Sequence, residues 1–499
     1  MICEKIQNLI NYAVQNKLIR TDDEFVIRNQ LMNTLNLTEW IQPQGTNDAL
    51  SIDEILNSLV EYACKNKIID DTTASHDLFD TKLMGCLTML PHEVIDIFHK
   101  KYADSPQTAC DWYYNYNQKL NYVRASRIAK ELKWQYLSEF GLLDITINLS
   151  KPEKDPRDIA KAQVQTSAYP KCQLCPENAG FAGNLNHPAR QNLRPIPLCI
   201  NGEKWQFQYS PYGYYNEHCI IFNESHQPMK IDSCIFEKLF DVLDIFPHYF
   251  VGSNADLPIV GGSILSHEHF QGGNYSFPMN YAETEYTFSL AEFPNVQAAT
   301  IKWPLSVIRL KSTSRLELSN FCTLVTKCWK EYSDSSVGIW CKTDNTLHNT
   351  ITPIARKNAD YYECDLVLRN NITSNECPLG VFHPNPSLHH IKKENIGLIE
   401  VMGLAILPSR LSKELAKLKE VLINGDNPEI YPETIQHSEW AKDILKRNPD
   451  FSEKNAEKII QDEVGAVFEK VLCDAGVFKR DLKGQAAFLR FIDYIESHS

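Results

Sequence analysis

The middle of the chain repeats one order of predicted elements. Residues 205–222 have a strand-like pattern, a helical stretch follows around 232–249, and the segment at 261–273 is expected to be a strand. A strand, a helix and a strand pair follow again between residues 305 and 370. Apolar residues at period two indicate strands, and apolar residues at period 3.6 indicate helices. The order therefore predicts an α+β core of two similar halves.

Both ends of the chain have helical patterns. The segment "LINYAVQNKLI" at 9–19 is nearly copied by "LVEYACKNKII" at 59–69, and each copy is followed by acidic turn residues and another apolar segment. This predicts a duplicated helical hairpin, because two copies are too few for a solenoid. From residue 411 the chain is rich in Lys, Glu and Leu and again helical.

Strand signals begin with "LLDITINLS" at 142–150, and "KPEKDPRDIA" at 151–160 then begins a helix. We predict four regions. They are a helical N-terminal region at 1–140, the first half of the core at 141–285, the second half at 286–410 and a helical C-terminal region at 411–499.

Composition limits the partners and the compartment. The 499 residues are 43% hydrophobic and 23% charged, which is typical of a folded globular protein. The net charge of −13 argues against a nucleic acid or a membrane surface as partner, although a small anion could still bind in a local basic pocket. No apolar run approaches the ~18 residues of a membrane span. The N-terminus lacks a secretory signal, and the 15 cysteines predict free thiols in a reducing cytoplasm.

The segment "GGSILSHEHFQGG" at 261–273 is the clearest candidate for a functional site. On a strand, His267, His269 and Gln271 would share one face, while Glu268 and Phe270 would point the other way. The glycine pairs at both ends would let a ligand or another backbone approach closely. The alternative is a polar strand that faces solvent and carries its histidines incidentally.

A second candidate is "KCQLCPEN", which contains Cys172 and Cys175. A CxxC pair is a common metal-binding turn, but zinc needs two further nitrogen or sulfur ligands. Two ordinary structural cysteines are an alternative. A thioredoxin-like redox pair is another, although Pro176 and a loop rich in Gly and Asn follow where a helix would be expected. We interpret the other 13 cysteines as small core residues.

The motifs HxHxQ and CxLCPxN, with "IIFNESHQPMKI" at 220–231, together resemble the galactose-1-phosphate uridylyltransferase family of the histidine-triad superfamily. With "DLFDTKLMG" at 77–85 and "NLSKPEKDPRDIA" at 148–160, the chain is similar to the bacterial second class of that family over essentially its whole length. The resemblance implies an α+β fold: a duplicated, histidine-triad-like antiparallel sheet core with helical N-terminal and C-terminal extensions.

The resemblance also implies an activity in galactose metabolism. It implies exchange of UMP between UDP-glucose and galactose 1-phosphate, which yields glucose 1-phosphate and UDP-galactose, by a cytoplasmic homodimer. His269 would be the nucleophile that carries UMP, and Gln271 would bind the phosphoryl oxygens. The substrate would also contact Tyr212, Asn254 and Ser263. The residues implied as ligands of a structural zinc ion are Cys172, Cys175, His226 and His267.

The sequence departs from the better-known class of that family at several positions. Glu268 stands where that class has proline, and "YYECDLVLRN" at 361–370 lacks histidines for a second metal. Residues 394–408 do not match that class's hexose-binding residues. His348 stands alone in the second half and is interpreted as structural. Gln271 cannot titrate, unlike the third histidine of related hydrolases, and therefore favours transfer over hydrolysis.

Two alternative functions remain open at this level. One is another histidine-triad nucleotidylyltransferase or phosphorylase, such as a dinucleoside tetraphosphate phosphorylase. The other is a non-catalytic, zinc-stabilised protein that binds nucleotide sugars.

Overall fold

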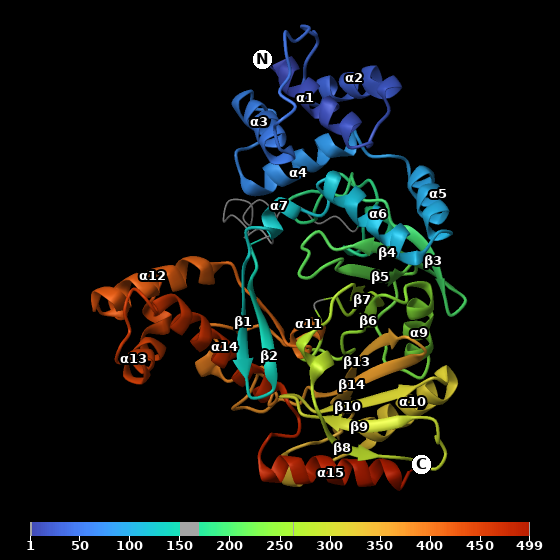
Figure 1. Ribbon diagram of the computed structural model, residues 1–499, viewed down its shortest axis with the longest axis vertical. Helices are drawn as coiled ribbons and strands as arrows, with labels where there is room; N and C mark the ends of the chain where they lie inside the picture. Colours follow the sequence, from blue (N-terminus) through green and yellow to red (C-terminus); the bar gives the residue numbers. More distant parts are fainter. Residues whose placement is uncertain (1, 150–168, 263, 499) are drawn as a thin grey trace. The chain divides into compact units, whose positions relative to one another are not determined.

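The computed structural model describes residues 2–149, 169–262 and 264–498 (Figure 1). The chain forms two compact units: unit 1 is Met1–Lys130 with Ser150–Gln227, and unit 2 is Glu131–Leu149 with Pro228–Ser499. The fold is α+β with mainly antiparallel sheets and helical chain ends, as predicted. The helix predicted at 151–160 and the site residue Ser263 lie outside the described residues.

Unit 1 begins with seven α-helices (Figure 1). They are α1 (Ile2–Gln15), α2 (Glu24–Thr34), α3 (Ile52–Lys65), α4 (Thr73–Gly85), α5 (Pro91–Tyr102), α6 (Pro106–Lys119) and α7 (Ala125–Ile128). Helices α1 and α2 form one hairpin and α3 and α4 form the next, and α1 packs against α3. The predicted duplication of a helical hairpin is therefore confirmed.

The two hairpins share their turns as well as their helices. Lys17 and Lys67, just after α1 and α3, have the same positive φ of 58°. In each turn the next backbone N–H donates to a carbonyl five residues earlier, at 2.9 Å in both copies. Leu-Met pairs at 31–32 and 83–84 are buried in both second helices. The near-copy in sequence thus produces one local structure twice.

Within residues 169–227, unit 1 contains three antiparallel strands, β3 (Ile196–Ile200), β4 (Glu203–Tyr209) and β5 (Cys219–Asn223). Helix α5 packs against β3. Phe207 and Tyr209 of β4 pack against the ring of Tyr113 on α6, with ring centroids 5.6 and 5.3 Å apart. The segment predicted as one strand at 205–222 is therefore two strands joined by a loop at 210–218.

Unit 2 contains seven antiparallel strands in the order β7-β6-β13-β14-β10-β9-β8. They are β6 (Phe250–Gly252), β7 (His269–Gly273), β8 (Thr284–Phe288), β9 (Gln297–Ile301), β10 (Val307–Ser312), β13 (Asn349–Asn358) and β14 (Tyr361–Asn370). Helices α9 (Ile235–Ile245) and α10 (Arg315–Glu331) pack on these strands. The β6–β7 hairpin follows α9 and the β13–β14 hairpin follows α10, which is the repeated order predicted from the sequence.

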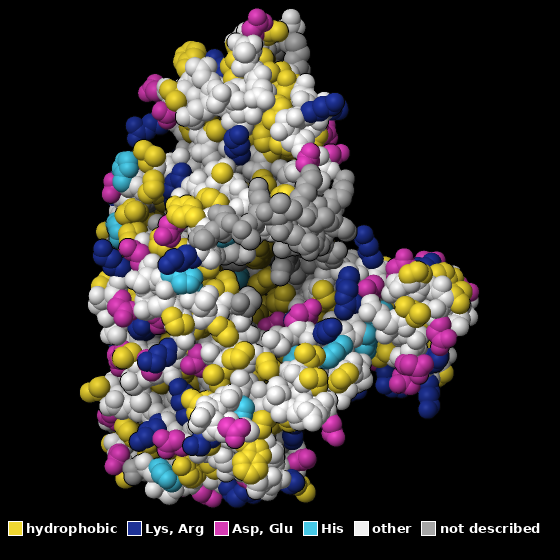
Figure 2. Space-filling view, turned by 180° about the vertical axis from the view of Figure 1, so that it is seen from behind, with side chains coloured by type: hydrophobic (Ala, Val, Ile, Leu, Met, Phe, Trp, Pro, Cys, Tyr) yellow, Lys and Arg dark blue, Asp and Glu magenta, His cyan; other side chains and the backbone are white. Residues whose placement is uncertain are grey.

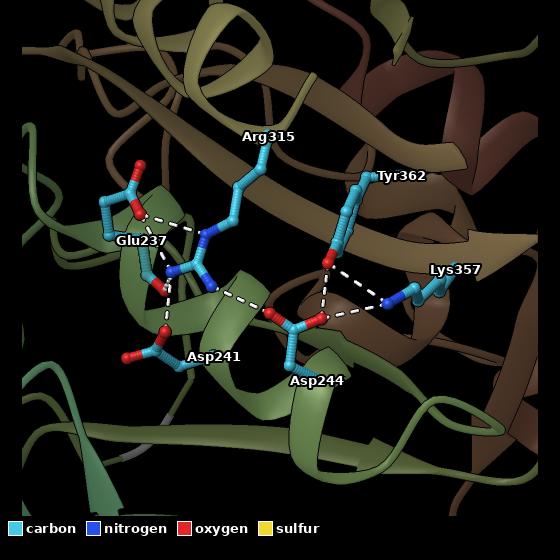
Figure 3. A network of polar contacts seen from close by, with 6 residues as sticks. All are labelled: Glu237, Asp241, Asp244, Arg315, Lys357 and Tyr362. Carbon is cyan, nitrogen blue, oxygen red and sulfur yellow. Dashed lines mark hydrogen bonds and ion pairs between the residues drawn. The ribbon is translucent and has the colours of Figure 1, made fainter. Parts of the chain in front are cut away.

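A network of polar contacts joins α9, α10 and the β13–β14 hairpin (Figure 3). Its members are Glu237, Asp241, Asp244, Arg315, Lys357 and Tyr362. Arg315 of α10 binds Glu237 at 2.8 Å and Asp241 at 2.6 Å. Asp244 accepts from Arg315 at 2.8 Å and from Lys357 at 2.9 Å. The network ties α9, and the residues that follow it, to the second helix–hairpin group.

A smaller sheet in unit 2 contains β1 (Leu132–Ser138), β2 (Gly141–Ile147) and β15 (Leu404–Leu407), with β15 parallel to β2. The prediction that the chain is helical up to residue 140 is wrong after Ile128, because residues 132–138 pair with β2 along their whole length. Trp134 also donates to the Gln461 carbonyl of α14 at 3.1 Å. These contacts with distant residues override the local pattern.

The short helix α11 (Leu398–Val401) precedes β15. The last part of unit 2 is helical, as predicted from residue 411, and its helices are α12 (Arg410–Asn424), α13 (Ser438–Arg447), α14 (Ala456–Ala475) and α15 (Leu482–Glu496). A two-stranded ribbon of β11 (Lys342–Thr343) and β12 (Thr346–Leu347) completes the strands. Among the described residues, no helix combines the length and the apolar character that crossing a membrane requires. On the face shown in Figure 2, basic side chains are interspersed with acidic ones.

The described chain also has short 3-10 helices. They are Thr21–Asp23, Pro176–Asn178, Pro278–Tyr281, Ser335–Val337, Pro386–Leu388, Pro428–Ile430 and Ile435–His437. All 15 cysteines are described, and each is a thiol outside any disulfide, as predicted. Of the 13 interpreted as core residues, six are buried, whereas Cys199, Cys234 and Cys377 are exposed. The core interpretation is wrong for these three, because the sequence pattern does not show which face of a strand or loop meets solvent.

Candidate active site

Unit 1 contains a Cys/His group that could hold a metal ion, and it includes Cys172, Cys175 and His226. The two Sγ atoms are 3.6 Å apart, and Sγ of Cys175 is 3.2 Å from Nδ1 of His226. The Leu174 backbone N–H lies 3.4 Å from Sγ of Cys172. Sulfur and imidazole ligands at such spacings suit zinc.

Asn178 stabilises the turn that presents the two cysteines. Its Nδ2 donates to the carbonyl oxygens of Cys172 and Cys175, both at 2.8 Å. Its Oδ1 lies 2.6 Å from Nε2 of His187. Asn178 is 1% exposed, so the turn is fixed from inside unit 1. The conformation of the CxxC turn therefore depends on an asparagine three residues beyond it.

In unit 2, His269 is the first residue of β7 and is almost completely buried. Its Nδ1 lies 2.8 Å from the carbonyl oxygen of His267. A carbonyl oxygen can only accept a hydrogen bond, so Nδ1 carries the proton and Nε2 has the lone pair. This hydrogen bond fixes the tautomer of His269.

Burial also determines the charge of His269. Loss of hydration lowers the pKa of His269 to about 4, and the hydrogen bond to His267 only partly opposes this shift. The imidazole is therefore neutral at pH 7. A neutral imidazole with a free nitrogen lone pair is a nucleophile that needs no deprotonation.

The segment before β7 differs from the predicted strand. Regular strand begins at His269, and His267 lies in a bend just before it. The pairing of β7 with β6 covers only Gln271–Gly273, so residues 267–268 are not part of that ladder. The predicted single strand face for His267, His269 and Gln271 is thus wrong for His267, which is nevertheless fully buried.

Glu268 forms a buried ion pair that the sequence analysis did not find. Its Oε1 lies 2.7 Å from Nζ of Lys238 on α9, and both side chains are about nine-tenths buried. The pair anchors the residue between His267 and His269 to a helix behind them. A lysine in the apolar helix "IFEKLFDVLDI" was the available signal, because a buried lysine needs an anionic partner.

The long connection between β6 and β7 contains Asn254 and the first glycine pair. Asn254 is buried, and its Oδ1 accepts from the backbone N–H of Leu398 at 3.0 Å, at the start of α11. A Cβ on Gly262 would lie 2.7 Å from Nδ2 of Asn254. The glycine is therefore needed for a close approach, as predicted, although what approaches is the side chain of Asn254. Gln271 is half-buried and pairs with Gly252 of β6.

Tyr212 lies in the loop at 210–218 of unit 1. Its ring stacks on Tyr214, with centroids 6.2 Å apart, and Tyr214 stacks on His218 at 5.2 Å. The loop thus contains a row of aromatic rings in which Tyr212 and Tyr214 are half-buried and His218 is buried. Aromatic faces suit a planar base.

In the second helix–hairpin group, His348 is buried and has two side-chain partners. Its Nδ1 lies 2.9 Å from Oδ1 of Asn371, and its Nε2 lies 2.9 Å from Oγ1 of Thr343. Both ring nitrogens are therefore engaged, which confirms the structural interpretation of His348.

A buried, neutral histidine at the start of a strand in an α+β fold is compatible with an enzyme that uses a nitrogen nucleophile. Residues 17–228 match the family model "Galactose-1-phosphate uridyl transferase, N-terminal domain". Residues 242–442 match the model of its C-terminal domain. The chain belongs to the galactose-1-phosphate uridylyltransferase family.

Full-length relatives agree with this assignment. The chain is 49% identical to a galactose-1-phosphate uridylyltransferase of Fusobacterium nucleatum, with 99% of both chains covered. It is 50% identical to the enzyme of the same name from Clostridium acetobutylicum, with 99% and 100% covered. A crystal structure of a yeast Ap4A phosphorylase matches with a TM-score of 0.36 and 12% identity, covering 68% of this chain and 92% of that one. That score is too low to establish a common fold.

Proposed function

We propose that the chain is a nucleotidyltransferase that exchanges UMP between UDP-glucose and galactose 1-phosphate, giving glucose 1-phosphate and UDP-galactose. The family assignment and the full-length relatives of that name support this function. The observation that carries the proposed mechanism is the hydrogen bond from Nδ1 of His269 to the His267 carbonyl. This hydrogen bond occupies Nδ1, so that the lone pair of Nε2 can attack the substrate.

In the first half-reaction, Nε2 of His269 attacks the α-phosphorus of UDP-glucose. The bond to the β-phosphate oxygen breaks, and glucose 1-phosphate leaves with that electron pair. The imidazole keeps its Nδ1 proton and becomes cationic, and the His267 carbonyl stabilises that charge. In the second half-reaction, a phosphate oxygen of galactose 1-phosphate attacks the same phosphorus and releases neutral His269. Such transfers depend chiefly on positioning and charge stabilisation.

The other predicted residues would bind the substrate. Gln271 would donate its amide to the non-bridging phosphoryl oxygens, Asn254 and Ser263 would line the phosphates, and Tyr212 would stack on uracil. Two observations support this set: Gln271 follows His269 by two residues within β7, and Tyr212 belongs to the row of aromatic rings.

Intact-mass analysis after mixing the protein with UDP-glucose alone tests the mechanism. A uridylyl increment on the chain is expected, with one glucose 1-phosphate released per site and parallel double-reciprocal lines with both substrates. Binding without an increment would indicate a nucleotide-sugar binding protein. Transfer with a dinucleoside tetraphosphate and phosphate instead would indicate a phosphorylase.

We also propose a structural zinc ion, with His267 as the fourth ligand beside Cys172, Cys175 and His226. Four protein ligands leave no open position for water, so the metal would stabilise the fold and take no part in the transfer. Elemental analysis of active protein should find stoichiometric zinc. His267→Asn should lower the unfolding midpoint, and active protein without a stoichiometric metal would contradict the proposal.

Three further predictions accompany this function. The enzyme is proposed to act in the cytoplasm. It is also proposed to be a homodimer, and light scattering on the purified protein tests this oligomeric state directly. The four-part division at residues 140, 285 and 410 also stays a prediction, and limited proteolysis at these three positions would test it.

A further inference from the structure

We propose that the second helical hairpin binds one divalent transition-metal ion, of the zinc type, through Cys64, Asp71 and His76. Cys64 lies in the last turn of α3, Asp71 in the connection, and His76 in the first turn of α4. The ion would close the hairpin at its turn. This inference concerns unit 1 alone and does not rest on the proposed function.

The distances between the three side chains fit one tetrahedral ion. Sγ of Cys64 lies 3.4 Å from Nε2 of His76, and the same nitrogen lies 3.0 Å from Oδ1 of Asp71. All three ligand atoms lie within 4.8 Å of one another. Zinc bonds of about 2.3 Å to sulfur and about 2.0 Å to nitrogen or oxygen place tetrahedral ligands about 3.3–3.5 Å apart. The Cys64–His76 and His76–Asp71 distances are therefore within a few tenths of an ångström of those values, and Cys64 and Asp71 lie within 4.8 Å of each other.

The thiol and the carboxylate approach the same ring nitrogen, Nε2 of His76. As an N–H, this nitrogen can only share its one proton between Oδ1 of Asp71 and the weak acceptor Sγ of Cys64, and as a lone-pair donor it can accept only from the thiol. A cation among the three atoms would attract all of them at once, with Cys64 as thiolate and Nε2 as lone-pair donor.

The types of the ligands select the class of metal. One sulfur, one imidazole nitrogen and one carboxylate oxygen suit zinc and its neighbours, whereas magnesium and calcium prefer oxygen ligands alone. The side chain of His76 is 38% exposed and that of Asp71 is 83% exposed, so an ion can enter from solvent. Three protein ligands leave the fourth position to water.

The first hairpin shows that the fold of the second does not need this trio. At the position of Cys64 the first copy has Val14, and the two turns share the same backbone conformation. When α2 and α4 are aligned by their buried Leu-Met pairs, Glu24 stands at the position of His76. The first copy therefore folds without cysteine or histidine at these positions. The trio is an addition to the second copy, which points to a ligand.

The test compares metal binding by the full-length wild type with that by the double variant Cys64→Val/His76→Gln. Val14 shows that valine fits at the first position. Cys86→Val is the matched control, because Cys86 is also half-buried and lies at the end of α4. Each apoprotein is titrated with Zn(II), and the bound ions are counted after gel filtration.

The double variant should bind one ion fewer per chain than the wild type, and Cys86→Val should bind as many as the wild type. The expected difference is one whether or not the zinc site of the proposed function is filled, so the two proposals fail separately. Titration with Co(II) should give a thiolate-to-cobalt charge-transfer absorption that decreases in the double variant. Equal Zn(II) stoichiometry and equal Co(II) spectra in wild type and double variant would overturn the inference.

Discussion

The β6–β7 and β13–β14 hairpins follow equivalent helices, yet they differ in length and in the charges that they contain. The β6–β7 hairpin pairs only Phe250–Gly252 with Gln271–Gly273, and a long connection joins the strands. The β13–β14 hairpin pairs all ten residues of each strand across the tight turn at Ala359 and Asp360. In the β6–β7 hairpin, strand β7 begins with the neutral His269, whereas the β13–β14 hairpin contains buried ion pairs.

The ion pairs of the long hairpin form one buried cluster. Asp365 of β14 accepts from Nε and Nη2 of Arg309 at 2.7 and 2.9 Å, and from Arg356 at 2.9 Å. Glu363 pairs with Arg356 and lies 2.5 Å from Lys311. One arrangement of helix and hairpin is thus used for two different purposes. Full pairing with matched charges makes a scaffold, while the short pairing with a long connection places His269, the proposed nucleophile, at the start of β7.

The largest expected effect is at His269. His269→Asn should abolish the uridylyl adduct and lower kcat by at least about 10⁴-fold, because a nucleophile has no substitute in a covalent mechanism. Binding of UDP-glucose, measured by calorimetry, should be largely retained. His348→Asn is the counterpart in the second group and should lower stability while the adduct still forms. An adduct on His269→Asn would show that the nucleophile is another residue.

The second expected effect is on stability, at Asp365. Asp365→Asn leaves two buried arginines without their shared carboxylate, which typically costs about 3–5 kcal/mol of unfolding free energy. Asp244→Asn makes the same change in the half-exposed network of Figure 3 and should cost less than about 1 kcal/mol. Denaturant unfolding of both variants measures the difference. If both variants lost the same unfolding free energy, burial would not be the reason that the Asp365 cluster contributes more than the Asp244 network.

The same variant has a pH dependence with a definite sign. Burial raises the pKa of Asp365, but the charges of Arg356 and Arg309 outweigh it, so its pKa is below the ordinary 3.8. A lowered folded-state pKa means that the stabilisation is complete above the unfolded-state pKa and is lost as pH falls through the folded value. The stability difference between wild type and Asp365→Asn should therefore be constant from about pH 5 to 8 and shrink below about pH 4.

The third expected effect is at Gln271. Gln271→Glu should place negative charge beside the phosphoryl oxygens, and loss of one such donor typically lowers the rate by about 10²–10³-fold. Gln297→Glu makes the same change at an exposed position of β9 and should leave the rate unaltered. Gln271→His should introduce slow hydrolysis of UDP-glucose, measured as free UMP. An unimpaired Gln271→Glu enzyme would remove Gln271 from the site.

The smallest expected effect is at the Lys238–Glu268 pair, which we interpret as positioning the segment that contains His267 and His269. Glu268→Gln removes the charge but preserves the shape, and small displacements of a reacting group lower rates strongly. We expect kcat to fall about tenfold, with KM for UDP-glucose unchanged within about twofold. Lys238→Met combined with Glu268→Gln should be no worse than the poorer single variant. A change in KM alone would contradict a positioning role.

Local patterns in the sequence were sufficient for much of the fold. The near-copies at 9–19 and 59–69 predicted two helical hairpins because periodic apolar residues within one segment reflect one buried face. The β-rich segments that became β2, β13 and β14 were predicted for the same reason. The pattern failed at 132–138, where pairing with β2 makes a strand, and at His267, where a bend precedes β7.

The candidate site divides in the same way. The spacing of His267, His269 and Gln271 and the CxxC turn are visible in the sequence, because adjacent positions on one segment remain adjacent in any fold. The partners of Glu268 and Asp365 are not visible, since Lys238 is 30 residues away and Arg309 is 56 residues away. Which distant charges meet depends on how helices and strands pack, and no local period encodes it.

By itself, the sequence determined the order of elements, the duplicated hairpin and the residues able to carry the chemistry, because these depend on side-chain types and short-range spacing. Only the tertiary structure decided where β7 begins, which nitrogen of His269 carries the proton and how far burial lowers its pKa. The physical reason is that tautomer and pKa are set by neighbours and by loss of water, and both of these arise only when distant segments pack together.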